Sequence, residues 1–284
     1  MTAAAAAGPL IGPITGVTIC TPVLEASEAA YVQHLRYRVT RRGTISAAQA
    51  ALWQRPAVAG ARYVALSPAA ADDFEFRLIE SRPPAGSYRA FAHHGWNAAE
   101  LIVQDVDALA AELADSPFQI IGPPQDLSFA EDIRAMQLRG PAGEIIYLTQ
   151  FKRELPELPA PPARCAIDRV FIMIVTGPSL DGLLDFYSER FAIPRPQPMQ
   201  SRVKVMSEVF GLSPEERYRI AAVPVRGRCY IEADQMPAAA RPPEASPDAL
   251  PPGIAIVSFR QQEGGEPRCL TGAAGEIIEL TPAG

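Results

Sequence analysis

The sequence predicts an α+β fold built from four repeats of a strand, a helix and three strands, paired into two similar domains. Residues 142–149 read AGEIIYLT and residues 274–281 read AGEIIELT, so seven of eight positions are identical. The segments that begin at Ile14 and Ile167 echo each other more loosely, in pattern rather than identity. Between the two halves, residues 154–163 contain four prolines, which favour an extended linker. Together these observations indicate an ancient duplication.

The first half contains two of the predicted repeats. A β-branched bias at 14–20 favours a strand, and apolar residues spaced by three and four favour a helix over 25–38. Asp105 is a predicted N-cap, because its carboxylate can accept a free amide of the first helical turn. The other predicted elements are helices near 46–54 and at 105–114 and strands at 61–67, 74–80, 98–103, 118–121, 133–139 and 144–150.

The second half follows the same order but ends in a unit without a helix. The third repeat is predicted as a strand at 167–175, helices at 179–190 and near 203–211, and strands at 217–223 and 228–233. The fourth consists of strands at 254–259, 266–270 and 276–281, which leave little room for a helix. We expect a flexible tail at 1–12, a first domain at 13–153, the linker at 154–165 and a second domain at 166–284.

Composition excludes several classes of protein. The 284 residues are 48% hydrophobic, which is enough for a core, and a net charge of −6 lacks the basic footprint of a nucleic-acid binder. No apolar run approaches the ~20 residues of a membrane helix, and the N-terminal segment lacks the features of a secretory signal. The four cysteines form no C-x-x-C pair and are expected to be free thiols. We expect a cytoplasmic protein with a small-molecule ligand, and its edge strands would permit a homodimer.

The repeats resemble those of the vicinal oxygen chelate superfamily, which includes glyoxalases, bleomycin-resistance proteins and extradiol dioxygenases. The resemblance covers about residues 12–282, and its most specific parts are the two AGEII-x-LT strands and the passage AAELIVQDVDALAAEL. It implies two glyoxalase-like domains, in each of which a pair of repeats curls into a cup around a ligand. Metal-dependent members carry a His on the first strand of a repeat and a Glu on the last, a donor set that suits a divalent metal.

When the ligand positions implied by the resemblance are compared with this sequence one by one, few of them hold a residue that can bind a metal. The positions are Gly16 and Arg77, Ala98 and Tyr147, Arg169 and Glu232, and Gly253 and Glu279, each pair giving the first-strand and last-strand residue of one repeat. Only Glu232 and Glu279 are carboxylates, and Arg169 cannot lose its proton to become a ligand. We therefore expect no metal and no other cofactor.

Three interpretations of the second domain stay open. Arg169 can replace the charge of the lost metal and hold the cup closed through an arginine–carboxylate pair. Alternatively, Arg169 binds a substrate carboxylate or enolate while Glu279 or Glu232 acts as general base. In the third interpretation the register is wrong, since a shift of one residue turns a side chain to the other face of the sheet.

In the first domain, strand alternation places Glu100 on the same face as Ala98. Glu100 and Tyr147 are candidates for an acid–base pair, with Arg77 as the group that holds an anion. The alternative is a buried polar cluster that only shapes the pocket. His94 and Trp96 lie at the entry to strand 98–103 and are candidate substrate-binding residues at the mouth of the cup. Trp96 would suit an aromatic ligand, although a tryptophan more often packs in the core than binds a ligand.

The leading hypothesis is a metal-independent protein that acts on a small organic acid or aromatic compound, as an isomerase or lyase that removes a proton next to a carbonyl. The second is a non-catalytic protein that binds and sequesters a small molecule, as bleomycin-resistance proteins do. The third is an iron-dependent extradiol dioxygenase, against which the missing histidines argue. The sequence contains no G-x-S-x-G motif, so a nucleophilic hydrolase has no support.

Overall fold

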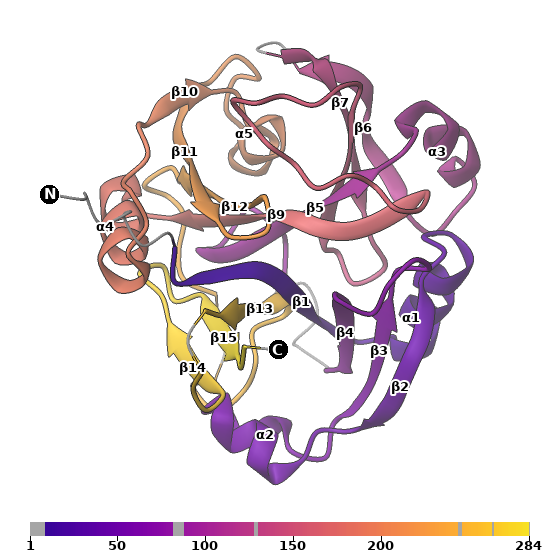
Figure 1. The fold of residues 1–284 in the computed structure, drawn as a ribbon, viewed down its shortest axis with the longest axis vertical. Coiled ribbons are helices and arrows are strands. Elements are labelled where there is room, and N and C mark those ends of the chain that lie inside the picture. The colour runs from indigo at the N-terminus through magenta and orange to yellow at the C-terminus, as the bar shows by residue number, and fades with distance from the viewer. Residues whose placement is uncertain (1–8, 82–87, 128–129, 244–245, 263, 284) are drawn as a thin grey trace, which may run out of the picture.

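A computed structural model describes residues 9–81, 88–127, 130–243, 246–262 and 264–283. Its strands form two curled sheets, called sheet I and sheet II here, whose backs face each other across the middle of the molecule (Figure 1). The expected tail at 1–12 falls largely outside the described residues, and the first strand already begins at Ile11. The α+β class and the two cup-forming sheets are as the sequence predicts.

Sheet I joins the first and fourth repeats. It contains β1 (Ile11–Thr21), β2 (Arg38–Thr44), β3 (Arg62–Ser67), β4 (Glu75–Glu80), β13 (Gly253–Gln261), β14 (Arg268–Thr271) and β15 (Ile277–Thr281). Its strand order is β14-β15-β13-β1-β4-β3-β2. Strand β1 lies at the centre of the sheet, antiparallel to β13 and parallel to β4.

Sheet II joins the second and third repeats. It contains β5 (Gly95–Val103), β6 (Gln119–Leu127), β7 (Ala130–Arg139), β8 (Ile145–Phe151), β9 (Ile167–Gly177), β10 (Met199–Ser201), β11 (Tyr218–Val225) and β12 (Cys229–Gln235). Its strand order is β10-β11-β12-β9-β5-β8-β7-β6. The antiparallel pairing of β5 with β9 joins its two repeats.

Each sheet therefore takes one repeat from each half of the chain. The sequence predicts one pair of repeats in each of the segments 13–153 and 166–284, and these segments do not coincide with the two sheets. The difference has a simple cause. The first strand of each repeat is an apolar run that can pair with the first strand of any other repeat, so tertiary packing decides which partner it takes.

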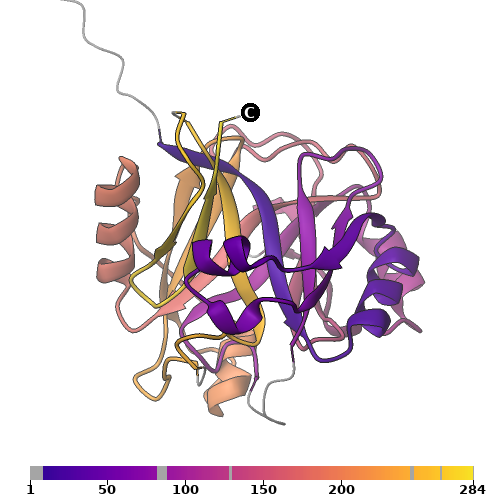
Figure 2. The same cartoon turned by 90° about the horizontal axis from the view of Figure 1, so that it is seen from below.

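The helices lie at the ends of the sheets and over their concave faces. They are α1 (Leu24–Gln33), α2 (Ala47–Leu52), the 3₁₀ helix η1 (Pro56–Val58), α3 (Val106–Leu113), α4 (Leu180–Phe191) and α5 (Lys204–Phe210). Helices α1 and α3 lie on one side of the molecule and α4 on the opposite side (Figures 1 and 2). Asp105 Oδ1 accepts a hydrogen bond of 3.0 Å from the N–H of Ala108, which confirms the predicted N-cap.

Helix α1 is shorter than the predicted helix over 25–38. It ends at Gln33, Arg36 takes the left-handed conformation with φ of 60°, and β2 begins at Arg38. Strand β2 is an exposed edge strand, so its sequence shows no apolar alternation that would indicate a strand. Its arginines form ion pairs instead, for example Arg42 with Glu28.

Three apolar clusters hold the fold together. The largest lies between the sheets and includes residues of α1, α3 and α4. A second cluster contains side chains of α5 and of the concave face of sheet II, and a third contains side chains of α2 and of the concave face of sheet I. Each sheet is thus covered on its convex face by the central core and on part of its concave face by a short helix. We call the two concave faces cup I and cup II.

The repeated AGEII motif has the same structural role in both halves. Glu144 accepts a hydrogen bond of 2.8 Å from the Tyr31 hydroxyl, and Glu276 accepts one of 2.8 Å from the Tyr187 hydroxyl. Each carboxylate also accepts a backbone N–H from two residues earlier, at 2.8 Å. The two bonds fasten a helix that follows a strand of one sheet to a hairpin of the other, so the motif explains how the sheets are held back to back.

Two further expectations concern the surface and the cysteines. Among the described residues, no helix combines the length and apolar character needed to cross a membrane. All four cysteines are free thiols, and Cys20 and Cys229 are buried.

Candidate functional site

In each repeat the first and last strands lie side by side and parallel, which defines four equivalent positions in the cups. The residues that face each other there are Thr18 and Arg77, Glu100 and Tyr147, Ile174 and Glu232, and Ser258 and Glu279. The last-strand residues are those that the sequence analysis named. The first-strand residues at these positions differ in every repeat from the expected ones, which are Gly16, Ala98, Arg169 and Gly253.

The differences come from the register of the first strands. Gly16 and Ala98 precede Thr18 and Glu100 by two residues, so they lie on the same face as the facing positions. Arg169 lies near the beginning of β9, and Gly253 is the first residue of β13. These two are therefore not the cup residues of their strands. The first-to-last strand pairings themselves run without a register shift, whereas the pairings of β1 with β13 and of β5 with β9 are interrupted by shifts. A count along the sequence foresees neither the point at which a first strand faces a last strand nor the place of a shift.

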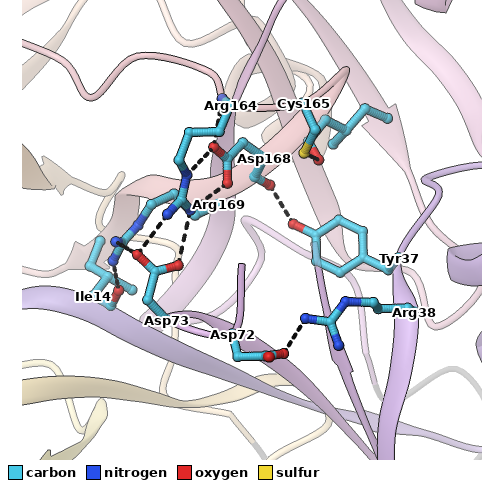
Figure 3. A network of polar contacts seen from close by, with 10 residues as sticks. Ile14, Tyr37, Arg38, Asp72, Asp73, Arg164, Cys165, Asp168 and Arg169 are labelled. Atoms are coloured by element: carbon cyan, nitrogen blue, oxygen red, sulfur yellow. Dashed lines mark hydrogen bonds and ion pairs between the residues drawn. The ribbon is translucent and has the colours of Figure 1, made fainter. Parts of the chain in front are cut away.

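Arg169 belongs to a polar network that links the two halves of the chain (Figure 3). Its guanidinium is 2.9 Å from Asp73 and also donates to the carbonyl oxygen of Ile14, and Arg164 joins the same Asp73 to Asp168. The expected cluster of Arg169 with Glu232 and Glu279 is thus wrong, because Glu232 lies in sheet II and Glu279 in sheet I.

In cup I the Glu279 carboxylate is saturated by donors. One oxygen accepts the Trp53 indole N–H at 2.8 Å and the Gln49 amide at 3.0 Å, and the other accepts the Ser258 hydroxyl at 2.6 Å. Arg77 lies 3.6 Å from that second oxygen. The Glu279 residue is only 4% exposed. Cup I therefore presents a closed structural cluster to any ligand.

Helix α2 supplies the residues that close cup I. The Arg77 guanidinium lies 5.3 Å from the centre of the Trp53 ring, and it forms an ion pair of 2.8 Å with Glu75. Ala50 and Trp53 pack against apolar residues of sheet I, including Ile256. Arg77 accordingly accompanies Glu279, and the expected grouping of Arg77 with Glu100 and Tyr147 is wrong.

Cup II holds a group of acidic side chains. Glu100 on β5 faces Tyr147 on β8, and Glu232 on β12 has Asp234 two residues further along the same face. Glu100 accepts one hydrogen bond of 2.6 Å, from the Thr149 hydroxyl. None of the ion pairs among the described residues connects this group to a lysine or arginine. We call Glu100, Tyr147, Glu232 and Asp234 the acidic cluster.

The acidic cluster is open at one end and closed at the other. Glu100, Tyr147 and Glu232 are half-buried, and Ala222, which pairs with Glu232 on the neighbouring strand, is exposed. Asp234 is fully buried, and neither of its carboxylate oxygens has a hydrogen-bond partner. Cup II is therefore accessible beside Glu232 and becomes dry toward Asp234.

The environment raises the pKa values of the whole cluster. Burial raises the pKa of Glu100 to about 7, against which the Thr149 hydrogen bond acts. Burial and the neighbouring charge of Glu100 raise the pKa of Glu232 to about 8. Burial and then Glu232 hold the pKa of Asp234 well above its usual range, and burial does the same for the Tyr147 hydroxyl. Near neutral pH the cluster thus combines one carboxylate with several neutral proton donors.

The charged side chains of β7, β11 and α5, which flank cup II, form their hydrogen bonds outside the acidic cluster or are exposed to solvent. Arg139 on β7 donates to Gln119, and Arg219 on β11 binds Asp181. On α5, Lys204 and Glu208 are both exposed. No cation on these elements compensates the three carboxyl groups of the cluster.

The residues of neither cup fit the divalent metal that the fold family implies. In cup I one carboxylate is surrounded by an arginine, an indole, an amide and a hydroxyl, and three of these groups donate hydrogen bonds to it. In cup II the facing positions hold no histidine, and Ile174 occupies the position opposite Glu232. Within the described ranges, no three His, Cys, Asp or Glu side chains are arranged to hold a metal ion.

His94 and Trp96 lie outside the acidic cluster. The Trp96 indole N–H donates to the Ile277 carbonyl at 2.9 Å, and the ring is 6.3 Å from that of Phe259, so Trp96 joins sheet II to sheet I. His94 lines a narrow cleft whose lining does not include Glu100, and burial lowers its pKa. The structure gives Trp96 the packing role that was one of its two interpretations.

Sequence reasoning missed Asp234 and the donors of cup I. Asp234 had a local signal, because Glu232 and Asp234 alternate on one strand and must share a face. No local sequence pattern indicates Trp53 or Gln49 as a donor, since Trp53 is 226 residues from the carboxylate that it binds.

Comparison with known proteins supports the fold. No protein-family model matches the chain, and no curated protein matches its sequence significantly. Glyoxalase I from Zea mays superposes with a TM-score of 0.61 and 11% identity, covering 94% of this chain and 91% of that one. A putative dioxygenase from Bacillus subtilis gives a TM-score of 0.61 and 9% identity, covering 96% and 86%. The chain therefore has the vicinal oxygen chelate fold.

Both of these structures match almost the whole chain, so the two cups of the fold lie within this single chain. At identities of 11% and 9%, these likenesses show the fold alone and carry no specific activity to this chain.

Proposed function

We propose that the protein is a metal-independent enzyme that transfers a proton next to a carbonyl group, as an isomerase or lyase, and that cup II is its active site. The observation that carries the proposal is Glu100. It is a half-buried carboxylate that faces Tyr147, and its pKa is raised to about 7. A general base works best when its pKa lies near the working pH.

The cluster supplies each group that the reaction needs. Glu100 removes a proton from the carbon next to the carbonyl, and the electron pair of the C–H bond moves onto the carbonyl oxygen. Tyr147 and the protonated Glu232 carboxyl donate hydrogen bonds to this oxygen as its charge develops. Glu100 then returns the proton to another carbon, which completes an isomerisation. In a lyase reaction, a leaving group on the next carbon departs with the electron pair.

The charge of cup II limits the class of substrate that the site can bind. The Glu100 carboxylate has no compensating cation among the described residues and disfavours an organic acid, and the apolar residues of the second cluster favour an aromatic or aliphatic carbonyl compound. Cup I is excluded from this proposal because its carboxylate already has donors on both oxygens.

We expect a bell-shaped pH dependence of proton exchange. The rate rises as Glu100 loses its proton near pH 7 and falls as Glu232 loses its own near pH 8. Exchange at about pH 5.5 should therefore be at least about tenfold slower than at about pH 7.5. The measurement is loss of the CH₂ signal of hydroxyacetone and 2-hydroxy-1-phenylethanone in D₂O, followed by NMR.

Two results would contradict the proposal. One is exchange no faster than in buffer for both ketones. The other is a rate that stays constant across this pH range, because it would show that neither carboxyl group takes part.

A further inference from the structure

We propose that cup II selects ligands that carry a cationic group, with Asp234 as the residue that pairs with it. The inference rests on the assignment of cup II in the proposed function and adds the class of substrate. Asp234 is fully buried, and neither carboxylate oxygen has a hydrogen-bond partner. Buried carboxyl groups in proteins are normally paired or hydrogen-bonded, so a group with neither indicates a missing partner.

The rest of cup II defines the charge of that partner. Glu100 and Glu232 lie on the same concave face as Asp234, and the arginines Arg139 on β7 and Arg219 on β11 are engaged with Gln119 and Asp181. Within the described residues, cup II thus offers three acidic groups and no lysine or arginine that forms an ion pair with them. An ammonium or amidinium group complements this arrangement, whereas a carboxylate would be repelled.

The layout of the cup separates binding from chemistry. Solvent reaches the cluster beside Glu232, where the neighbouring Ala222 is exposed, and the dry end is at Asp234. A ligand that enters with its cationic group first would bring that group to Asp234. The parts of the ligand that follow would then lie along the face that carries Glu100 and Tyr147. Asp234 therefore orients the substrate, while Glu100 exchanges the proton.

The pairing of Asp234 with a cation also predicts that the proton of its carboxyl group is released. In the free protein, burial and the neighbouring Glu232 raise the pKa of Asp234, which favours the protonated form of its carboxyl group. When a cation binds, the carboxyl group ionises to pair with it, and its proton passes to the solvent. Binding of a permanent cation near neutral pH should therefore be accompanied by the release of protons.

Titration calorimetry with benzamidine, benzamide and benzoate tests the inference, because the three probes share one ring and differ in charge. We expect benzamidine to bind at least about tenfold more tightly than benzamide, and benzoate to bind least. Repeating the titration in two buffers of different ionisation enthalpy counts the released protons. Asp234→Asn keeps the shape of the protonated side chain and should abolish both the preference and the proton release.

The matched control is Glu208→Gln, which removes an exposed carboxylate from α5 and should leave both unchanged. Equal affinity for benzamidine and benzamide, or an unchanged preference in Asp234→Asn, would overturn the inference. If Asp234→Asn does not fold, Glu232→Gln provides the second test and should weaken the preference for benzamidine. Benzamidine has no proton next to a carbonyl, so this result is independent of the exchange assay that tests the proposed function.

Discussion

Glu100→Gln is expected to lower the rate of proton exchange by about 100-fold to 10,000-fold, the range over which a general base contributes to catalysis. Glutamine has nearly the shape of glutamate and can still accept the Thr149 hydroxyl through its amide oxygen. It cannot take a proton from carbon. The loss should therefore lie in the chemical step, with the affinity for the ketone kept.

The measurement is kcat/KM for exchange of 2-hydroxy-1-phenylethanone, compared with the wild type and with Glu208→Gln. Glu232→Gln should behave differently, because a glutamine amide can still donate a hydrogen bond. We expect a smaller loss and the disappearance of the decline in rate above about pH 8. If Glu100→Gln exchanged at the wild-type rate, the base would have to lie elsewhere.

Trp53→Ala is expected to destabilise the protein by about 3–5 kcal/mol, the usual cost of removing a buried tryptophan. Trp53 is 1% exposed, its ring packs in the cluster under α2 and lies beside Arg77, and its N–H donates to Glu279. Trp53→Phe keeps most of the ring but removes this donor. It should cost about 1–3 kcal/mol, because Glu279 then loses one hydrogen bond in a buried site.

Urea unfolding followed by circular dichroism measures both changes. Ala51→Ser on the exposed side of the same helix is the control and should change the free energy of unfolding by less than about 0.5 kcal/mol. All three variants should exchange protons at the wild-type rate under conditions in which they are folded. A folded Trp53 variant with normal stability and impaired exchange would make cup I the active site and refute the assignment of cup II.

The sequence predicted those features that repeat closely. The AGEII-x-LT strands are nearly identical in the two halves, so the positions of Tyr147 and Glu279 followed directly from the alignment. Glu232 and Arg77 also lie at the facing positions of their repeats. The four-repeat architecture and the missing helix of the last repeat followed from the same periodic pattern.

The pairing of the repeats and the place of Arg169 did not follow from the sequence. Strand β1 pairs with β13 rather than with β5, and nothing in its apolar side chains distinguishes the two partners. Arg169 stands in β9 at a place that the resemblance assigns to a ligand, but it binds Asp73 and Ile14. Register shifts in the first strands separate sequence spacing from spatial position, so only contacts between distant residues settle such assignments.

Whether cup II works without a metal is tested by the metal content of the purified active protein, measured by mass spectrometry together with exchange before and after treatment with EDTA. We predict no stoichiometric iron, zinc, manganese or nickel and an exchange rate that EDTA leaves unchanged, because neither cup offers the donors that such an ion requires. One tightly bound metal ion per chain, lost from the protein together with its activity and absent from Glu100→Gln, would show that cup II is a metal-dependent active site.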